Sequence, residues 1–244
     1  MPFGFLGDFT DDRNVLVMTP EGGVIKRTPA YKNETNLQEI NAKIQLEENG
    51  NLTATLNRVS KGLQYDDRSF YETLAKEELI KRYKSRVWSY NNNLEIVSVD
   101  LVNDKEKVVL KEDLKISIKS YASVNEQEYL FRVNVFNKET FVPKRYRNRK
   151  LPLKISRGYK DIDKYEFTLP KGYTLSILPK EKEISTKFGA YKVTFTKIND
   201  TSFKYNKTII IKEGVYSKED YKSYRSFRRS IAKYENLRIA ITKK

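Results

Sequence analysis

The sequence predicts a mainly β protein, a large antiparallel β-sandwich with two peripheral α-helices. Apolar and polar residues alternate over most of the chain, and Gly-, Asn- and Asp-containing turns separate the alternating runs. Only two stretches change to the spacing of a helix. The 244 residues are enough for one large domain or two smaller ones, each with a buried core.

The first strands form two predicted hairpins. Residues 15–18 and 24–27 are short strands joined by the turn at 19–23, where glycine can adopt a positive φ. Residues 37–62 give the clearest hairpin, because two alternating arms of about ten residues flank Asn49-Gly50, a strong hairpin signal. Arms of this length indicate a large sheet with one buried face.

The first helical stretch covers residues 66–87, with Asp66 or Asp67 as its cap. We interpret Trp88, directly after it, as a packing residue rather than a ligand platform. A second helix starts near Ser217, where Ser217 and Asp220 resemble a capping box. One face of this helix carries an aromatic stripe, which predicts packing on a sheet; its basic flank leaves nucleic-acid binding as an alternative.

The remaining chain is predicted as strands with short turns. Their expected ranges are 94–102, 107–121, 128–136, 151–155, 165–169, 173–178, 193–197, 202–212 and 237–242.

The composition excludes several kinds of site. The chain has neither Cys nor His, so it cannot contain a Cys–His or Ser–His–Asp set, a thiolate or imidazole metal site, or a disulfide. Lys and Arg number 47 against 32 Asp and Glu, a net charge of +15 that favours acidic partners. Because Lys is spread over nearly the whole chain, this charge can equally serve to keep a large sheet soluble.

The densest basic segment is residues 144–150. Tyr146 lies between cations there and offers a stacking surface. The candidate polyanion-binding residues are Lys144, Arg145, Tyr146, Arg147, Arg149 and Lys150. The favoured interpretation of so short a segment is a solvated loop between two sub-lobes, residues 31–142 and 151–244.

Carboxylate pairs are the remaining acid–base option. Asp11-Asp12, Asp66-Asp67 and Glu77-Glu78 are adjacent in sequence, and neighbours seldom face one site. The first pair fits a turn and the second a helix cap. The chain also lacks a nucleophile elbow and glycine-rich phosphate loops. We therefore expect no enzymatic activity and no cofactor in this chain.

Several short motifs resemble bacterial transglutaminase-like proteins, in which a cysteine-protease-like core precedes a C-terminal β region of unknown function. The motifs that resemble the end of the core are Pro2-Phe3-Gly4, Asp11-Asp12-Arg13, Thr19-Pro20-Glu21-Gly22-Gly23 and Thr28-Pro29. Those that resemble the β region are the Asn49-Gly50 hairpin, Lys61-Gly62-Leu63-Gln64-Tyr65, Leu169-Pro170-Lys171-Gly172-Tyr173, Leu178-Pro179, Phe188-Gly189-Ala190-Tyr191, and Gly214-Val215-Tyr216 followed by Tyr221 and Phe227.

The resemblance implies that this chain is a non-catalytic accessory region, since the family's Cys, His and Asp would lie before Pro2. Residues 1–30 would be the tail of the upstream core and a lead-in hairpin, and 31–244 a β-sandwich accessory domain. The implied partners are the core in the same polypeptide and another envelope protein. The alternative, which rests on the basic segment and not on the resemblance, is a stand-alone module that binds an acidic polysaccharide or other polyanion, with nucleic acid less favoured.

The implied location is the periplasm or cell envelope. No apolar run reaches the roughly 18 residues of a membrane helix. The first eight residues lack the basic and apolar regions of a signal peptide, so we expect any export signal upstream.

Overall fold

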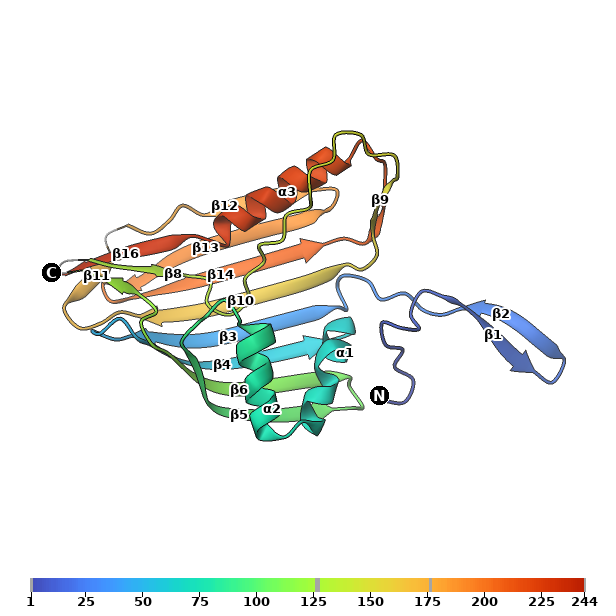
Figure 1. Ribbon diagram of the computed structural model, residues 1–244, viewed down its shortest axis with the longest axis horizontal. Helices are drawn as coiled ribbons and strands as arrows, with labels where there is room; N and C mark the ends of the chain where they lie inside the picture. Colours follow the sequence, from blue (N-terminus) through green and yellow to red (C-terminus); the bar gives the residue numbers. More distant parts are fainter. Residues whose placement is uncertain (1, 126–127, 176, 244) are drawn as a thin grey trace.

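The computed structural model describes residues 2–125, 128–175 and 177–243, and it confirms a mainly β fold (Figure 1). Its centre is an eight-stranded sheet in which all neighbours are antiparallel except β10 and β3. In spatial order its strands are β12 (Lys182–Thr186), β13 (Gly189–Asn199), β14 (Ser202–Ile211), β10 (Tyr159–Thr168), β3 (Leu37–Leu46), β4 (Leu52–Lys61), β6 (Val109–Ile118) and β5 (Leu94–Asp104). The parallel pair joins strands from before and after the basic segment into one sheet.

A second layer covers one face of the eight-stranded sheet. It contains a four-stranded sheet and the helices, which lie on the same side in Figure 1. The strands of the smaller sheet, in spatial order, are β11 (Tyr173–Leu175), β16 (Arg238–Lys243), β8 (Glu128–Arg132) and β7 (Ser123–Val124). Phe131 of β8 meets Phe167 of β10, with ring centroids 5.8 Å apart. The opposite face of the large sheet, here called the open face, carries polar and partly exposed side chains.

Two short strand pairs lie at the periphery. Strands β9 (Leu153–Ile155) and β15 (Gly214–Tyr216) pair with each other beside the N-terminal end of the last helix. Strands β1 (Asn14–Thr19) and β2 (Gly22–Arg27) form the predicted first hairpin, which projects from the body of the protein in Figure 1.

The predicted helix at residues 66–87 is divided, so the described chain has three α-helices instead of two. Its parts are α1 (Leu63–Ser69), the 3₁₀ segment η1 (Phe70–Thr73), α2 (Lys76–Arg82) and the π-helical segment η2 (Tyr83–Val87). Leu74 and Ala75 are extended, with ψ of 142° and 150°, and this breaks the helix.

The predicted cap at Asp66 or Asp67 is wrong. The helix starts after Gly62, whose φ is 60°, and the buried Asn36 side chain accepts a hydrogen bond from the Leu63 amide at 3.0 Å. A residue from before β3 therefore supplies the cap that local sequence assigned to an aspartate.

The C-terminal helix α3 (Tyr221–Tyr234) packs as predicted, with its aromatic stripe buried against the sheet. Half of the predicted capping box forms, because the Ser217 amide donates to Asp220 Oδ2 at 3.2 Å. Trp88 is fully buried, and its indole N–H donates to the Phe136 carbonyl at 2.8 Å, which confirms its packing role.

A buried lysine connects the two layers. Lys207 of β14 is 1% exposed, and its Nζ lies 2.7 Å from Asp163 Oδ2 and 3.2 Å from Glu235 Oε2. The same ammonium donates to the Asn137 carbonyl at 2.5 Å. Asp163 belongs to β10, Glu235 follows α3, and Asn137 precedes the basic segment, so this cluster ties three distant segments together.

Glu235 is the second centre of this cluster. It accepts hydrogen bonds from Tyr191 Oη at 2.9 Å, Asn134 Nδ2 at 2.6 Å and the Glu139 amide at 2.8 Å. Satisfied in this way, a buried carboxylate can remain in an interior that would otherwise exclude it.

Burial raises the pKa of Asp163 to about 6, although the neighbouring Lys207 opposes that shift. For Lys207, burial alone would lower the pKa, but attraction by Asp163 and Glu235 outweighs it and the pKa is raised. Lys207 is therefore charged at every physiological pH, and the carboxylates of Asp163 and Glu235 balance its positive charge.

Replacing the buried cation should destabilise the protein strongly. Lys207→Met leaves Asp163 and Glu235 buried without their counter-ion, and we expect a loss of about 3–5 kcal/mol in the free energy of unfolding. Lys204→Met, on the open face of the same strand, is the matched control and should change that free energy by no more than about 0.5 kcal/mol. Urea unfolding of both variants measures the difference, and equal losses would contradict this role for Lys207.

The raised pKa of Asp163 should make stability depend on pH. A carboxyl whose pKa is higher in the folded state adds stability below pH 4 that is lost as the pH rises to about 6. The unfolding free energy of the wild type relative to Asp163→Asn should therefore fall by up to about 3 kcal/mol across this range. Denaturation at several pH values tests this, with Asp100→Asn controlling for the loss of one charge. If the unfolding free energies of the wild type and Asp163→Asn changed with pH in parallel, the pKa of Asp163 would not be raised in the folded state.

Candidate functional site

The basic segment, residues 144–150, runs beside the N-terminal half of α3. Tyr221 Oη donates to the Lys144 carbonyl at 2.7 Å, and Arg225 Nε donates to the Pro143 carbonyl at 2.9 Å. These two bonds are made to the backbone carbonyls of Pro143 and Lys144, so they fix the path of the chain there without engaging the charged side chains of residues 144–150.

A third contact fixes the chain just before this segment. Arg228 is buried on α3, and its Nη2 lies 2.7 Å from Glu139 Oε1. Its Nε also donates to the Phe141 carbonyl at 3.3 Å. Three side chains of α3 therefore hold residues 139–144 in place.

The segment and the helix form a groove with a volume of about 900 Å³. Eight of the described lining residues are cationic, and Glu219 is the one acid among them, 3.9 Å from Lys218. The eight cations are Arg145, Arg147, Arg149, Lys150, Lys218, Lys222, Arg225 and Arg229. So many like charges around one concavity create a positive potential that concentrates anions.

An arginine and two tyrosines form one end of the groove. The Arg149 guanidinium lies 4.3 Å from the Tyr221 ring centroid and 5.9 Å from that of Tyr146, and its Nη2 donates to the Pro152 carbonyl at 2.9 Å. The side chain of Tyr146 is 55% exposed. Burial raises the pKa of Tyr221, which keeps its hydroxyl protonated as a donor. The groove thus presents an aromatic surface among cations.

Five of the six candidate residues line this groove, namely Arg145, Tyr146, Arg147, Arg149 and Lys150. Lys144 does not line it, and contributes its carbonyl to the contact with Tyr221.

The basic residues of the second wall were not predicted as part of the site. Lys218, Lys222, Arg225 and Arg229 are spaced by four, three and four residues, which places them on one side of a helix. That periodicity is visible in the sequence. Their position opposite residues 144–150 is not, because it depends on contacts between residues about 80 positions apart.

The paired carboxylates lie outside the groove. Asp11 Oδ1 is 2.5 Å from Arg157 Nη2, Asp66 Oδ2 accepts from the Asp8 amide at 2.8 Å, and Glu77 and Glu78 are in the first turn of α2. Across the described ranges, no group of three or more potential metal-binding side chains comes together.

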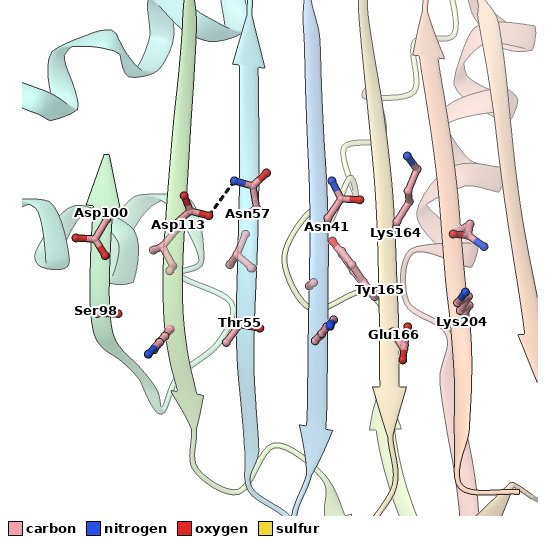
Figure 2. Close-up of a pocket in the computed structure, with 16 residues that line it drawn as sticks. Asn41, Thr55, Asn57, Ser98, Asp100, Asp113, Lys164, Tyr165, Glu166 and Lys204 are labelled. Carbon is pink, nitrogen blue, oxygen red and sulfur yellow. Dashed lines mark hydrogen bonds between the residues drawn. The ribbon is translucent and has the colours of Figure 1, made fainter. Parts of the chain in front are cut away.

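The open face forms a second concavity of about 630 Å³ (Figure 2). Strand register places Asp100, Asp113, Asn57, Asn41 and Lys164 in one row across five strands. Asn57 Nδ2 donates to Asp113 Oδ1 at 2.9 Å, the dashed line in Figure 2. The row runs from two acids through two amides to a lysine, and acids and lysines both line the concavity, so the open face has no dominant charge.

Comparison with known proteins gives a family match over part of the chain. Residues 127–241 match the family described as "Domain of Unknown Function with solved-structure structure (DUF3858)". The matched range includes both walls of the groove and the Lys207 cluster. These elements therefore lie within one matched region, and the description of the family assigns that region no activity.

A weak structural similarity extends to a larger protein. The solved chain is described as a "putative protease" from Parabacteroides distasonis, with 16% identity and a TM-score of 0.34. The alignment covers 49% of this chain and 24% of that chain, so about half of this chain spans about a quarter of the solved chain. No curated protein matches the sequence. At this identity and TM-score the structural match supports no argument about activity.

The Tyr221 contacts should control the order of the groove wall. Tyr221→Ala removes both the hydrogen bond to Lys144 and the surface under Arg149, so we expect faster tryptic cleavage within residues 144–150. Tyr221→Phe keeps the ring and should give an intermediate rate. Mass spectrometry of timed digests measures this, with cleavage sites on the open face as internal controls. Unchanged cleavage in Tyr221→Ala would contradict the contact's role.

Proposed function

We propose that this protein acts by recognition rather than catalysis, and that the groove between residues 144–150 and α3 binds an acidic polymer, such as an acidic polysaccharide. The observation that supports this most directly is the collection of eight cations and one acid around a single groove. Binding a flexible polyanion there releases its counter-ions, which supplies affinity without deep enclosure of the ligand.

The geometry of the groove supports a polymer better than a small ligand. Its cations come from two walls, and those on α3 extend from Lys222 to Arg229, seven residues or about 10 Å at 1.5 Å per residue, with Lys218 just before the helix. A chain with regularly repeated anionic groups can contact several of these cations together. Tyr146, exposed beside them, offers a flat surface for a sugar ring.

We further propose that this binding serves an accessory role in a transglutaminase-like protein of the bacterial envelope. The resemblance of the turn motifs supports this role, and the family of unknown function matched at 127–241 is compatible with it. In this arrangement the module would position the upstream core on an envelope polymer or a partner protein. Among the described residues, no helix is long and apolar enough to cross a membrane.

The polymer-binding proposal is tested with heparin as an acidic-polymer probe. The groove variant changes four exposed cations that make no contact with the segment's backbone, Arg145, Arg147, Lys222 and Arg229, to Ser. We expect its affinity at 100 mM salt to fall at least tenfold, and the slope of log K against log salt to decrease by up to about 4.

A matched control carries the same change in net charge on the open face. It replaces Lys43, Lys111, Lys115 and Lys204 by Ser, all exposed there. We expect this variant to keep most of the wild-type affinity. Equal losses in the two variants would show diffuse attraction by net charge and would overturn the groove assignment. If the protein bound single-stranded DNA more tightly than heparin at equal salt, the ligand class would be nucleic acid instead of an acidic polysaccharide.

The accessory role has a separate test in the genomic reading frame. A continuous upstream frame that encodes a catalytic Cys, His and Asp would support it. A frame without these residues would remove the link to a transglutaminase-like core, and would leave the groove proposal unaffected.

A further inference from the structure

A small concavity lies on the other end of the second layer, away from the basic groove. Its volume is about 220 Å³, and it is bounded by β8, β16, residues 90–93 after Trp88 and residues 118–123 after β6. Its described lining contains no Asp or Glu.

Two arginines line this concavity side by side on adjacent strands. Arg132 of β8 and Arg238 of β16 are directly opposite in the antiparallel register, so their side chains leave the same face of the sheet. Like charges in such a pair repel and destabilise a sheet. Within the described ranges, neither guanidinium has a carboxylate at ion-pair distance, although 13 acidic residues form such pairs with lysines or arginines elsewhere in the described chain.

Two lysines add to the same field, Lys119 in the lining and Lys138 beside Tyr90. The Lys138 ammonium lies 5.9 Å from the centroid of the Tyr90 ring, which lines the concavity. The pKa of Lys138 is lowered, first by burial and then by the charges of Arg132 and Arg238. The carboxylate that acts against this shift, Glu235, is buried and already bound by Lys207, Tyr191 and Asn134.

Within the described residues, no contact offsets the repulsion between Arg132 and Arg238. A bound anion would relieve that repulsion. Two guanidinium groups on adjacent strands present paired N–H donors, which match the oxygens of a phosphate or carboxylate. A volume of 220 Å³ accommodates such a group and is too small for a polymer segment.

We propose that this concavity is a binding site for a compact oxyanion, a phosphate or the carboxylate of a small acid, held between Arg132 and Arg238. It is distinct from the polymer-binding groove and does not depend on it. The two cross-strand arginines supply the charge and the paired donors, and Lys138 adds positive potential from the side.

The test measures thermal unfolding of the full chain with sodium phosphate or sodium succinate, each against sodium chloride at equal ionic strength. In the wild type we expect at least one oxyanion to raise the unfolding temperature by several degrees. Whether phosphate or succinate acts identifies the class of oxyanion.

The decisive variants are Arg238→Gln and Arg132→Gln combined with Arg238→Gln. In chloride, Arg238→Gln should unfold at the wild-type temperature or a few degrees above it, because the repulsion is relieved. In both variants the stabilisation by the oxyanion should be lost. A structural role for these arginines predicts the reverse, a lower unfolding temperature in chloride.

The control variant combines Arg147→Gln with Lys222→Gln, and so removes two charges from the groove instead. It should keep the full stabilisation by the oxyanion. The proposal is overturned if no oxyanion stabilises the wild type, if stabilisation persists in the double arginine variant, or if the groove variant loses it. Because Arg238 is exposed, its single replacement keeps the test valid even if the double variant folds poorly.

Discussion

The buried ammonium of Lys207 is the constraint on which the arrangement of this protein depends. A charge in an apolar interior is tolerated only with counter-ions and hydrogen bonds in good geometry. Asp163 and Glu235 provide the counter-ions, and the Asn137 carbonyl accepts a further hydrogen bond. These groups come from a central strand, the end of α3 and the start of the connection to β9. The position of each of these segments is therefore set by a single buried charge.

This constraint determines where the groove can form. Glu235 fixes the C-terminal end of α3, while Asn137 and Glu139 fix the chain that leads into the basic segment. Both walls of the groove thus start from the same buried cluster. The cationic side chains on these walls that make no contact with the rest of the fold extend into solvent. A strained or mobile scaffold would not hold eight like charges around one concavity.

The distribution of charge differs between the basic groove, the small site at Arg132 and Arg238, and the open face. The groove is almost uniformly basic, and the small site at Arg132 and Arg238 has cations without acids. The open face carries acidic, amide and basic groups side by side on neighbouring strands. The net charge of +15 is therefore not spread evenly, because eight cations line one groove.

Alternation and turn chemistry were enough to predict the β architecture, the Asn49-Gly50 hairpin and the buried aromatic stripe of α3, because these follow from local periodicity. The early part of β10 escaped prediction because Asp161 and Asp163 are charged yet buried, which inverts the usual pattern. The break at Leu74 and Ala75 and the cap from Asn36 escaped for a related reason, since both depend on distant contacts.

The sequence by itself determined the fold class, the absence of thiol and imidazole chemistry, and the basic segment at 144–150. Only the tertiary structure decided that this segment faces the basic side of α3, and that Arg132 faces Arg238. Local sequence sets the side of a strand or helix on which a charge lies. Which charges meet is set by the packing of elements far apart in the chain, through the buried Lys207 cluster and the strand register.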